Sequence, residues 1–356
     1  MKYLLPGLLG FLLMVGAQWA IADTMEQAPR DADELAFTNS PQDKQLEKIM
    51  EDDDAAMDEV DKWIQDNNAF KSQGAGESKS QLNQRIMARL DAVRKSYEDF
   101  LQRYPTNADA YLAFGSFLED TGDEDGASTQ YEKSRELNPR NPAAWNDLAN
   151  YYGENGPITN SFIYYAKAIE LNSNEPVYYE NLATTVYLYR RDAMQFYGIR
   201  EPQIFDKALV LYQKAIQLDP DNFALQTDYA ESYYGIKPLR TNDALAAWTN
   251  ALKIAHDETE REAVYIHLAR VKIAAGRFTE AQAHLDAVTN SQYDVLKRHL
   301  ESTMAERKKG VPSLYNMVFT NPPVEVASDG NVISNDVSPP NATAVLTNPP
   351  PPAAGQ

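Results

Sequence analysis

The sequence predicts an all-α solenoid of about five helical hairpins with capping helices and a disordered flank at each end. Two observations carry this prediction. Large apolar anchors recur every 34 residues, so that Tyr111 is followed by Trp145 and then Tyr179. Small residues such as Gly115 and Ala149 follow these anchors in phase and let two helices approach closely. A fixed period of this length, with large and small residues in register, is typical of stacked helical hairpins.

The composition fits a folded protein of this class. The 356 residues are 43% hydrophobic, which is enough for a sizeable core. A net charge of −19 argues against nucleic acid and anionic membranes as principal partners. The chain has no cysteine, which excludes disulfides, thiolate catalysis and zinc sites built on cysteine.

The N-terminus, residues 1–22, is predicted to be a secretory signal peptide. Lys2 supplies the basic start, residues 4–17 the apolar run and residues 20–22 a small-x-small cleavage site. The apolar run is short for a bilayer span. We therefore expect cleavage after Ala22 and a periplasmic or secreted protein without stable membrane insertion. The alternative is a retained N-terminal membrane anchor.

Residues 23–72 form an acidic segment. Its start is polar and expected to be disordered, while residues 42–66 have the pattern of an acidic amphipathic helix. A linker rich in Gly, Ser and Gln is expected at 67–79. Residues 23–66 carry 15 acidic residues against 4 basic ones. The helix is interpreted either as a docking helix for a basic partner or as an extension packed weakly on the array.

Residues 73–310 are predicted to form the repeat array with its caps. A long helix over 80–103 forms the N-terminal cap, and a helix ending at Gly310 forms the C-terminal cap. An irregular third hairpin is expected between regular ones at 108–141, 142–175, 223–258 and 262–295.

The third hairpin contains an insertion. Its second-helix anchor, Tyr212, follows Tyr165 by 47 residues instead of 34. The additional stretch, 189–205, includes Phe196 and Tyr197. Long insertions in repeat arrays often serve binding, and the alternative is an extended helix pair that lengthens the stack.

The C-terminal residues, 311–356, are rich in proline and are predicted to be a disordered tail. Such a tail is interpreted as an extension without a binding role. The alternatives are a polyproline ligand for another protein and a tether to a surface.

The repeated residues resemble those of the tetratricopeptide repeat (TPR), and the chain looks like an exported bacterial member of that family. The resemblance covers about 105–295 and is carried by Tyr111-x2-Phe114-Gly115-x2-Leu118, Ala127-x3-Tyr131-x2-Ser134 and Pro139. It implies a right-handed superhelix in which the first helix of each repeat lines a concave groove for a peptide or partner helix.

In such a groove, the positions one, five and eight residues after the first anchor face the ligand. In this sequence the candidate groove residues are Asn146, Asn150, Glu180, Thr184, Tyr187, Thr227, Glu231, Tyr234 and Arg270.

The resemblance implies a non-catalytic scaffold with a protein or peptide partner. Some members of the family clamp a carboxylate with Lys and Arg, but only Arg270 qualifies here, and Glu180 and Glu231 would repel an acidic peptide. The partner is therefore expected to be neutral to basic. The alternative is an envelope regulatory or carbohydrate-associated factor that binds through the Tyr-rich insertion at 189–205, since aromatic rings also stack on sugars.

No motif indicates an enzyme, a cofactor or a metal site. The run Asp123-x-Asp125-Gly126-x5-Glu132 resembles part of a calcium-binding loop, but the first ligand position falls on Thr121 and the run lies at a hairpin turn. The histidines lack metal-ligand spacing; they are His256, His267, His284 and His299.

Overall fold

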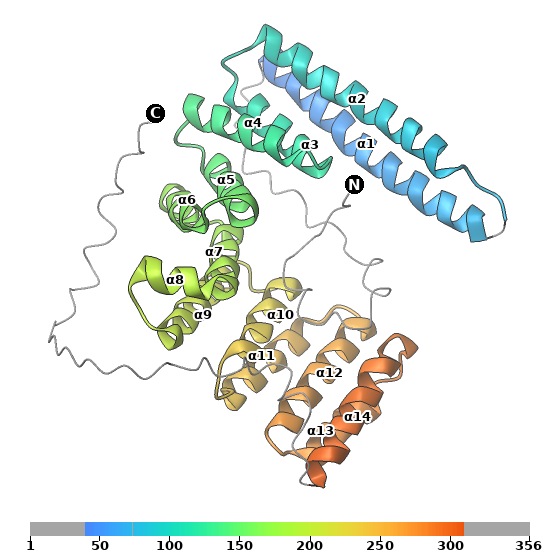
Figure 1. The fold of residues 1–356 in the computed structure, drawn as a ribbon, viewed down its shortest axis with the longest axis vertical. Coiled ribbons are helices and arrows are strands. Elements are labelled where there is room, and N and C mark those ends of the chain that lie inside the picture. The colour runs from blue at the N-terminus through green and yellow to red at the C-terminus, as the bar shows by residue number, and fades with distance from the viewer. Residues whose placement is uncertain (1–39, 73, 310–356) are drawn as a thin grey trace, which may run out of the picture. The chain divides into compact units, whose positions relative to one another are not determined.

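The computed structural model describes residues 40–72 and 74–309, which fold into fourteen α-helices (Figure 1). The predicted all-α architecture of paired helices is confirmed. The helices belong to two compact units, the first ending at Arg240 and the second beginning at Thr241. The predicted signal peptide at 1–22, the polar residues 23–39 and the Pro-rich tail at 311–356 lie outside the described residues.

The first unit is a series of helical hairpins in which α1 packs on α2, α3 on α4, α5 on α6 and α7 on α9 (Figure 1). Its elements are α1 (Pro41–Ser72), α2 (Lys79–Arg103), α3 (Ala108–Asp120), α4 (Glu124–Leu137), α5 (Pro142–Asn155), α6 (Ile158–Leu171), α7 (Pro176–Leu188), α8 (Arg190–Tyr197), α9 (Glu201–Leu218), α10 (Phe223–Ser232) and a 3-10 turn, η2 (Tyr233–Gly235).

The first helix of a hairpin begins at a capping residue that recurs with the repeat. The side chains of Asn107, Asn141 and Asn222 each accept a hydrogen bond from a backbone N–H in the first turn of α3, α5 and α10. Such caps satisfy donors that have no partner within the helix. Pro142 and Pro176 lie in the first turns of α5 and α7, where a missing N–H costs little. The same local signals therefore start successive first helices.

In three hairpins of the first unit, a tyrosine ring from the second helix is buried in the packing. Tyr131, Tyr165 and Tyr212 occupy equivalent positions on α4, α6 and α9, and all three are buried. Gly115 on α3 lies directly against the ring of Tyr131, so a Cβ at this position would overlap that ring. The small residue on the first helix thus makes room for the large residue on the second.

The helix α1 continues to Ser72, so the linker predicted from residue 67 begins later than expected. The buried side chain of Asn67 explains the difference. Its Oδ1 accepts a hydrogen bond from the backbone N–H of Glu77 at 2.8 Å. This bond holds the connecting segment against the end of the helix.

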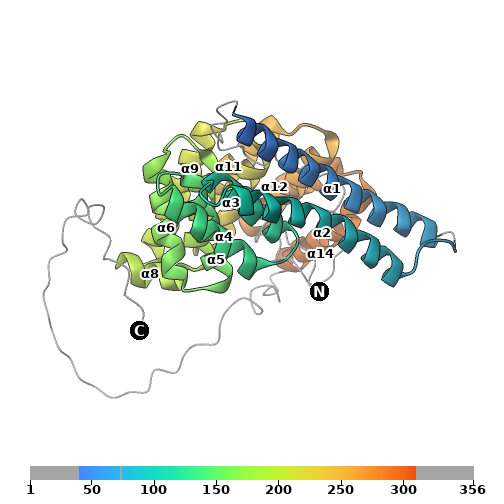
Figure 2. The same cartoon turned by 90° about the horizontal axis from the view of Figure 1, so that it is seen from above.

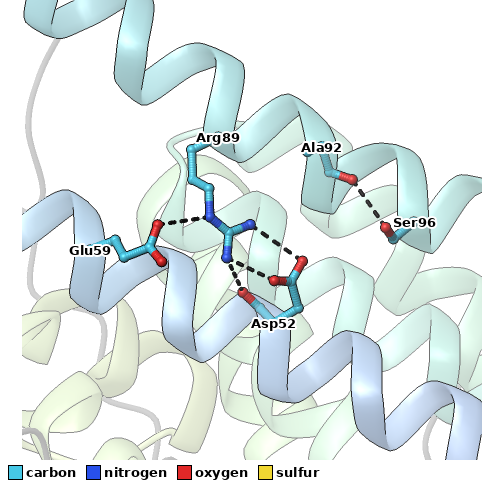
Figure 3. A network of polar contacts seen from close by, with 5 residues as sticks. All are labelled: Asp52, Glu59, Arg89, Ala92 and Ser96. Atoms are coloured by element: carbon cyan, nitrogen blue, oxygen red, sulfur yellow. Dashed lines mark hydrogen bonds and ion pairs between the residues drawn. The ribbon is translucent and has the colours of Figure 1, made fainter.

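The α1 helix lies along α2 (Figures 1 and 2) and is an integral part of the first unit. Arg89 of α2 bridges two acidic residues of α1, with Nη2 2.7 Å from Asp52 Oδ1 and Nε 3.0 Å from Glu59 Oε2 (Figure 3). Deeper in the interface, the hydroxyl of Tyr97 donates to Asp53 Oδ2 at 3.0 Å, and both side chains are buried. The acidic helix is therefore held by specific polar contacts as well as by its apolar face, which the interpretation of a weakly packed extension did not include.

The second unit is built around α12, which packs against α11, α13 and α14. Its elements are α11 (Thr241–Ile254), α12 (Glu258–Ala274), α13 (Phe278–Ala287), a 3-10 turn η3 (Ser291–Tyr293) and α14 (Asp294–Lys308). The predicted fourth hairpin at 223–258 is divided, since α10 belongs to the first unit and α11 to the second.

A buried carboxylate joins α12 to the turn that precedes α14. Glu262 accepts hydrogen bonds from the Thr289 hydroxyl and from the Asn290 backbone N–H, both at 2.7 Å. Burial alone would raise the pKa of Glu262, but these bonds outweigh it and the pKa is lowered. Within 40–72 and 74–309, no helix is both long and apolar enough to cross a membrane.

Candidate functional site

The candidate site is the surface of the first unit that the first helices of the repeats contribute, which we call the first-helix face. Helices α3, α5, α7 and α10 form it and follow one another along one side of the unit, with α4, α6 and α9 on the other side (Figure 1). It is lined by Ser116, Glu119, Asn146, Asp147, Asn150, Glu180, Asn181, Thr184, Asp228 and Glu231.

Two buried tyrosines hold polar groups of this face from beneath. Tyr131 donates its hydroxyl hydrogen to Glu119 Oε2 at 2.6 Å, and Tyr165 donates to Asn150 Oδ1, also at 2.6 Å. Burial raises the pKa of both tyrosines, so their hydroxyls remain protonated donors. Burial also raises the pKa of Glu119, although the bond from Tyr131 opposes this effect. The second helices thus position side chains of the first helices.

Three asparagines connect α5 to α7 across the first-helix face. Asn181 Nδ2 lies 3.1 Å from Asn146 Oδ1 and 3.5 Å from Asn150 Oδ1. Asn146 in turn donates to Asp147 Oδ1 at 3.2 Å. Because the amides bond to one another, their orientations are set before any ligand arrives. Asn146 itself is buried, whereas Asn150 keeps part of its surface open to solvent.

The third buried tyrosine lies among hydroxyl and carboxyl groups. The Tyr212 hydroxyl is 2.8 Å from Thr184 Oγ1. Burial raises the pKa of Tyr212, and the nearby carboxylates of Asp228 and Glu180 raise it further. Burial also raises the pKa of the Asp228 carboxyl, to about 7. A carboxyl with that pKa changes its charge close to neutral pH.

The charged residues of the first helices are all acidic. Helices α3, α5, α7 and α10 contain eight acidic residues and no lysine or arginine. The second helices α4, α6 and α9 do carry lysine or arginine. Because unlike charges attract and like charges repel, this face favours cationic or neutral groups over anionic ones.

Two predicted groove residues, Asn146 and Tyr187, are buried. The side chain of Tyr187 is 7% exposed and packs against Phe205, with ring centroids 5.8 Å apart. Its hydroxyl points at the backbone of Gly235 in η2 and bonds to it. The helical spacing placed Tyr187 correctly on α7, but the 3-10 turn after α10 covers it. The expectation that Tyr187 lines the groove surface is therefore wrong.

Four other predicted residues occupy different surroundings. Thr227 donates its hydroxyl to the Ala224 carbonyl of its own helix at 2.7 Å. Glu231 and Tyr234 are partly exposed at the end of α10 and in η2. Arg270 belongs to α12 in the second unit, where it lies near His267. Of the nine predicted residues, the contacts above join Asn146 with Asn150, and Glu180 and Thr184 with Tyr212.

On α5, α7 and α10, the sequence prediction missed three residues of the first-helix face: Asp147, Asn181 and Asp228. Each lies one position after a predicted groove residue. Their spacing could have identified them. Asp147, Asn181 and Asp228 are separated by 34 and then 47 residues, the same intervals that separate the three buried tyrosines. Positions that keep the phase of a buried anchor lie at the same level of the stack.

The other candidates from the sequence have structural roles. Asp123 caps α4, its Oδ1 accepting the Gly126 backbone N–H at 3.1 Å. His267 stacks on Trp248 with ring centroids 4.0 Å apart, and burial lowers its pKa to about 3, so it is neutral at pH 7. In the part of the chain that the structure describes, no three His, Cys, Asp or Glu side chains gather as metal ligands.

Comparison with known proteins agrees with this geometry. Residues 108–141 and 142–175, the α3/α4 and α5/α6 hairpins, each match the family model of the tetratricopeptide repeat. Residues 108–175 therefore contain two tetratricopeptide repeats. A comparison with curated proteins finds no match.

Several solved structures are similar to this chain. One is YrrB, described as a TPR protein with an unusual peptide-binding site, with 14% identity and a TM-score of 0.45 over 61% of this chain and 99% of that one. Another is MamA, with 21% identity and a TM-score of 0.39 over 50% of this chain and 95% of that one. A further MamA structure has 15% identity and a TM-score of 0.40 over 60% and 98% of the two chains.

Proposed function

We propose that this protein is a non-catalytic scaffold that binds a neutral to basic peptide segment of a partner protein on the first-helix face. TPR repeat proteins are generally non-catalytic scaffolds for protein or peptide partners. The observation that carries the charge preference is the absence of lysine and arginine from α3, α5, α7 and α10, which hold eight acidic residues.

The face offers two kinds of contact to such a segment. Asn150 and Thr184 are partly exposed and can bond to the amides of an extended backbone. Both are already oriented by buried tyrosines, so binding orders few additional side chains. The carboxylates of Glu180, Asp228 and Glu231 can pair with lysine or arginine side chains of the ligand.

The proposal also includes export. A protein cleaved after Ala22 would meet its partner in the periplasm or outside the cell, without nucleic acid or stable membrane insertion. Intact-mass measurement of the protein from a fractionated bacterial host tests this point. A mature N-terminus at Asp23 in the periplasmic or secreted fraction supports it, and an uncleaved protein in the membrane fraction supports the anchored alternative.

The binding proposal is tested by selecting a random peptide library on the mature full-length chain. Selected peptides should be enriched in lysine or arginine and depleted of acidic residues. Their affinity should fall about tenfold or more in Asn150→Arg, because the new cation stands in the middle of the face.

The matched control is Val210→Arg, which adds the same charge at a position of α9 that is 62% exposed. Circular dichroism checks that both variants are as helical as the parent. Equal affinity in both variants, or enrichment of acidic peptides, would show that the first-helix face is not the site.

A further inference from the structure

The insertion at 189–205 builds a second surface, which the proposed function does not use. Its helix α8 packs against α6 and α9. The rings of Phe196 and Tyr197 contact Phe162 of α6, with centroids 5.3 and 5.7 Å apart, and each other edge-on at 4.8 Å. Phe162 is fully buried, whereas Phe196 is 38% exposed. An aromatic cluster therefore runs from the core of the first unit to its surface.

A lysine of α9 lies on this cluster. Lys207 Nζ is 4.3 Å from the centroid of the Tyr197 ring, within the range of a cation–π contact. Burial lowers the pKa of Lys207. Among the described residues no carboxylate pairs with it. An ammonium group carries three donors, and a ring face does not replace the oxygen acceptors that it loses on leaving water.

The nearest acidic residues in the sequence are mostly engaged by other cations. Glu201 Oε1 lies 3.0 Å from Arg190 Nε, and Asp206 Oδ1 lies 2.6 Å from Arg240 Nη2. The third acidic residue of this stretch, Asp192, is exposed at the start of α8. Two of the three local carboxylates are thus neutralised by partners of their own.

Three cations of the same stretch remain without an ion pair among the described residues: Arg191, Arg200 and Lys207. The first two are exposed. We call these three cations, together with Phe196 and Tyr197, the α8 patch. Helix α8 packs on α9, so the three cations come from adjoining elements of a chain whose net charge is −19. Their charge is opposite in sign to that of the acidic residues on the first helices.

We propose that the α8 patch binds an acidic segment of a partner protein, with carboxylates of the segment at Lys207 and the two arginines and an apolar side chain against Phe196. Charge complementarity selects the sign of the segment. The exposed ring adds apolar contact area, and aromatic and arginine residues are typical anchors of interfaces. This site is independent of the first-helix face, so either one can fail without the other.

The geometry favours a peptide over a polysaccharide at this patch. Stacking on sugar rings needs open aromatic faces, but Tyr197 is largely enclosed, since burial raises its pKa and Lys207 covers its ring. Phe196 is the ring that reaches solvent. One partly exposed ring suits a single apolar side chain of a peptide.

The test measures fluorescence anisotropy of a labelled peptide of Glu and Asp around one Phe, titrated with the mature full-length chain. The wild type should bind it, and Arg191→Gln/Lys207→Gln should weaken binding about tenfold or more. Phe196→Ser should weaken it as well. The control Lys95→Gln removes a charge from an exposed position of α2 and should leave the affinity unchanged.

Three outcomes would overturn the proposal: no binding by the wild type, equal binding by the double variant, and tighter binding of polygalacturonate at the same residues. The last result would assign the patch to an anionic polysaccharide. Because Asn150→Arg leaves the α8 patch intact, binding of the acidic peptide should survive that substitution. Failure here is thereby distinguished from failure of the first-helix face.

Discussion

Replacing Tyr97 by phenylalanine should loosen helix α1 from the first unit. The Tyr97 hydroxyl donates to Asp53 Oδ2 at 3.0 Å, and both side chains are buried between α1 and α2. Phenylalanine keeps the stacked contact with Phe114, whose ring centroid lies 5.3 Å away. The substitution therefore removes one hydroxyl and leaves the packing of the ring in place.

The expected magnitude follows from the type of bond that is lost. Leaving a buried acceptor without its donor costs about 1–3 kcal/mol, because the acceptor then loses its hydrogen bond without regaining water. A loss of about 2 kcal/mol corresponds to a roughly 30-fold increase in the population of the opened state. The amides of α1 should exchange faster by about that factor, since α1 must separate from α2 for them to open.

Hydrogen exchange of the full-length chain, followed by mass spectrometry of peptides from α1 and α2, measures this directly. Tyr111→Phe is the matched control, because the Tyr111 hydroxyl makes an exposed bond of 3.4 Å to the Pro105 carbonyl. It should change the free energy of opening by less than about 0.5 kcal/mol. If Tyr97→Phe accelerates exchange no more than the control does, the buried bond does not hold α1 in place.

Three further changes test other parts of the structure. Gly115→Ala should destabilise the first unit by about 1–3 kcal/mol, because its Cβ would meet the ring of Tyr131; an unchanged urea midpoint would contradict this packing. Since burial raises the pKa of Asp228 to about 7, from 3.8, the stability linked to its proton is complete below pH 3.8 and is lost as the pH rises through 7. Asp228→Asn should therefore gain in Tm over the wild type between pH 4 and 8, and a pH-independent difference would argue against the raised pKa. Arg89→Met should cost less than about 1 kcal/mol and lose its effect in high salt, because both acidic partners of Arg89 are 49% exposed; a larger cost that salt does not change would indicate that the bridge is shielded from solvent.

The sequence by itself determined the repeated part of this protein. In a stacked array each hairpin contacts mainly its neighbours. The residues that make these contacts are therefore close in the sequence and recur at the same interval. Gly115 and Tyr131 were recognised as recurring positions of the 34-residue period, and the structure brings them into contact. Asn107 and Asn141, which cap α3 and α5, are 34 residues apart as well. The same period placed Asn150 and Thr184 on the first helices, where buried tyrosines position them.

Only the tertiary structure decided the features that have no counterpart in the period. The contact of Tyr97 with Asp53 joins two helices that the repeat pattern does not relate, so the integral role of α1 could not be predicted. Tyr187 is buried because a 3-10 turn later in the chain covers it. Lys207 meets Tyr197 because α8 folds back onto α9. In each case the residue in contact does not belong to the repeat pattern. A periodic pattern in the sequence can indicate only contacts that recur from repeat to repeat.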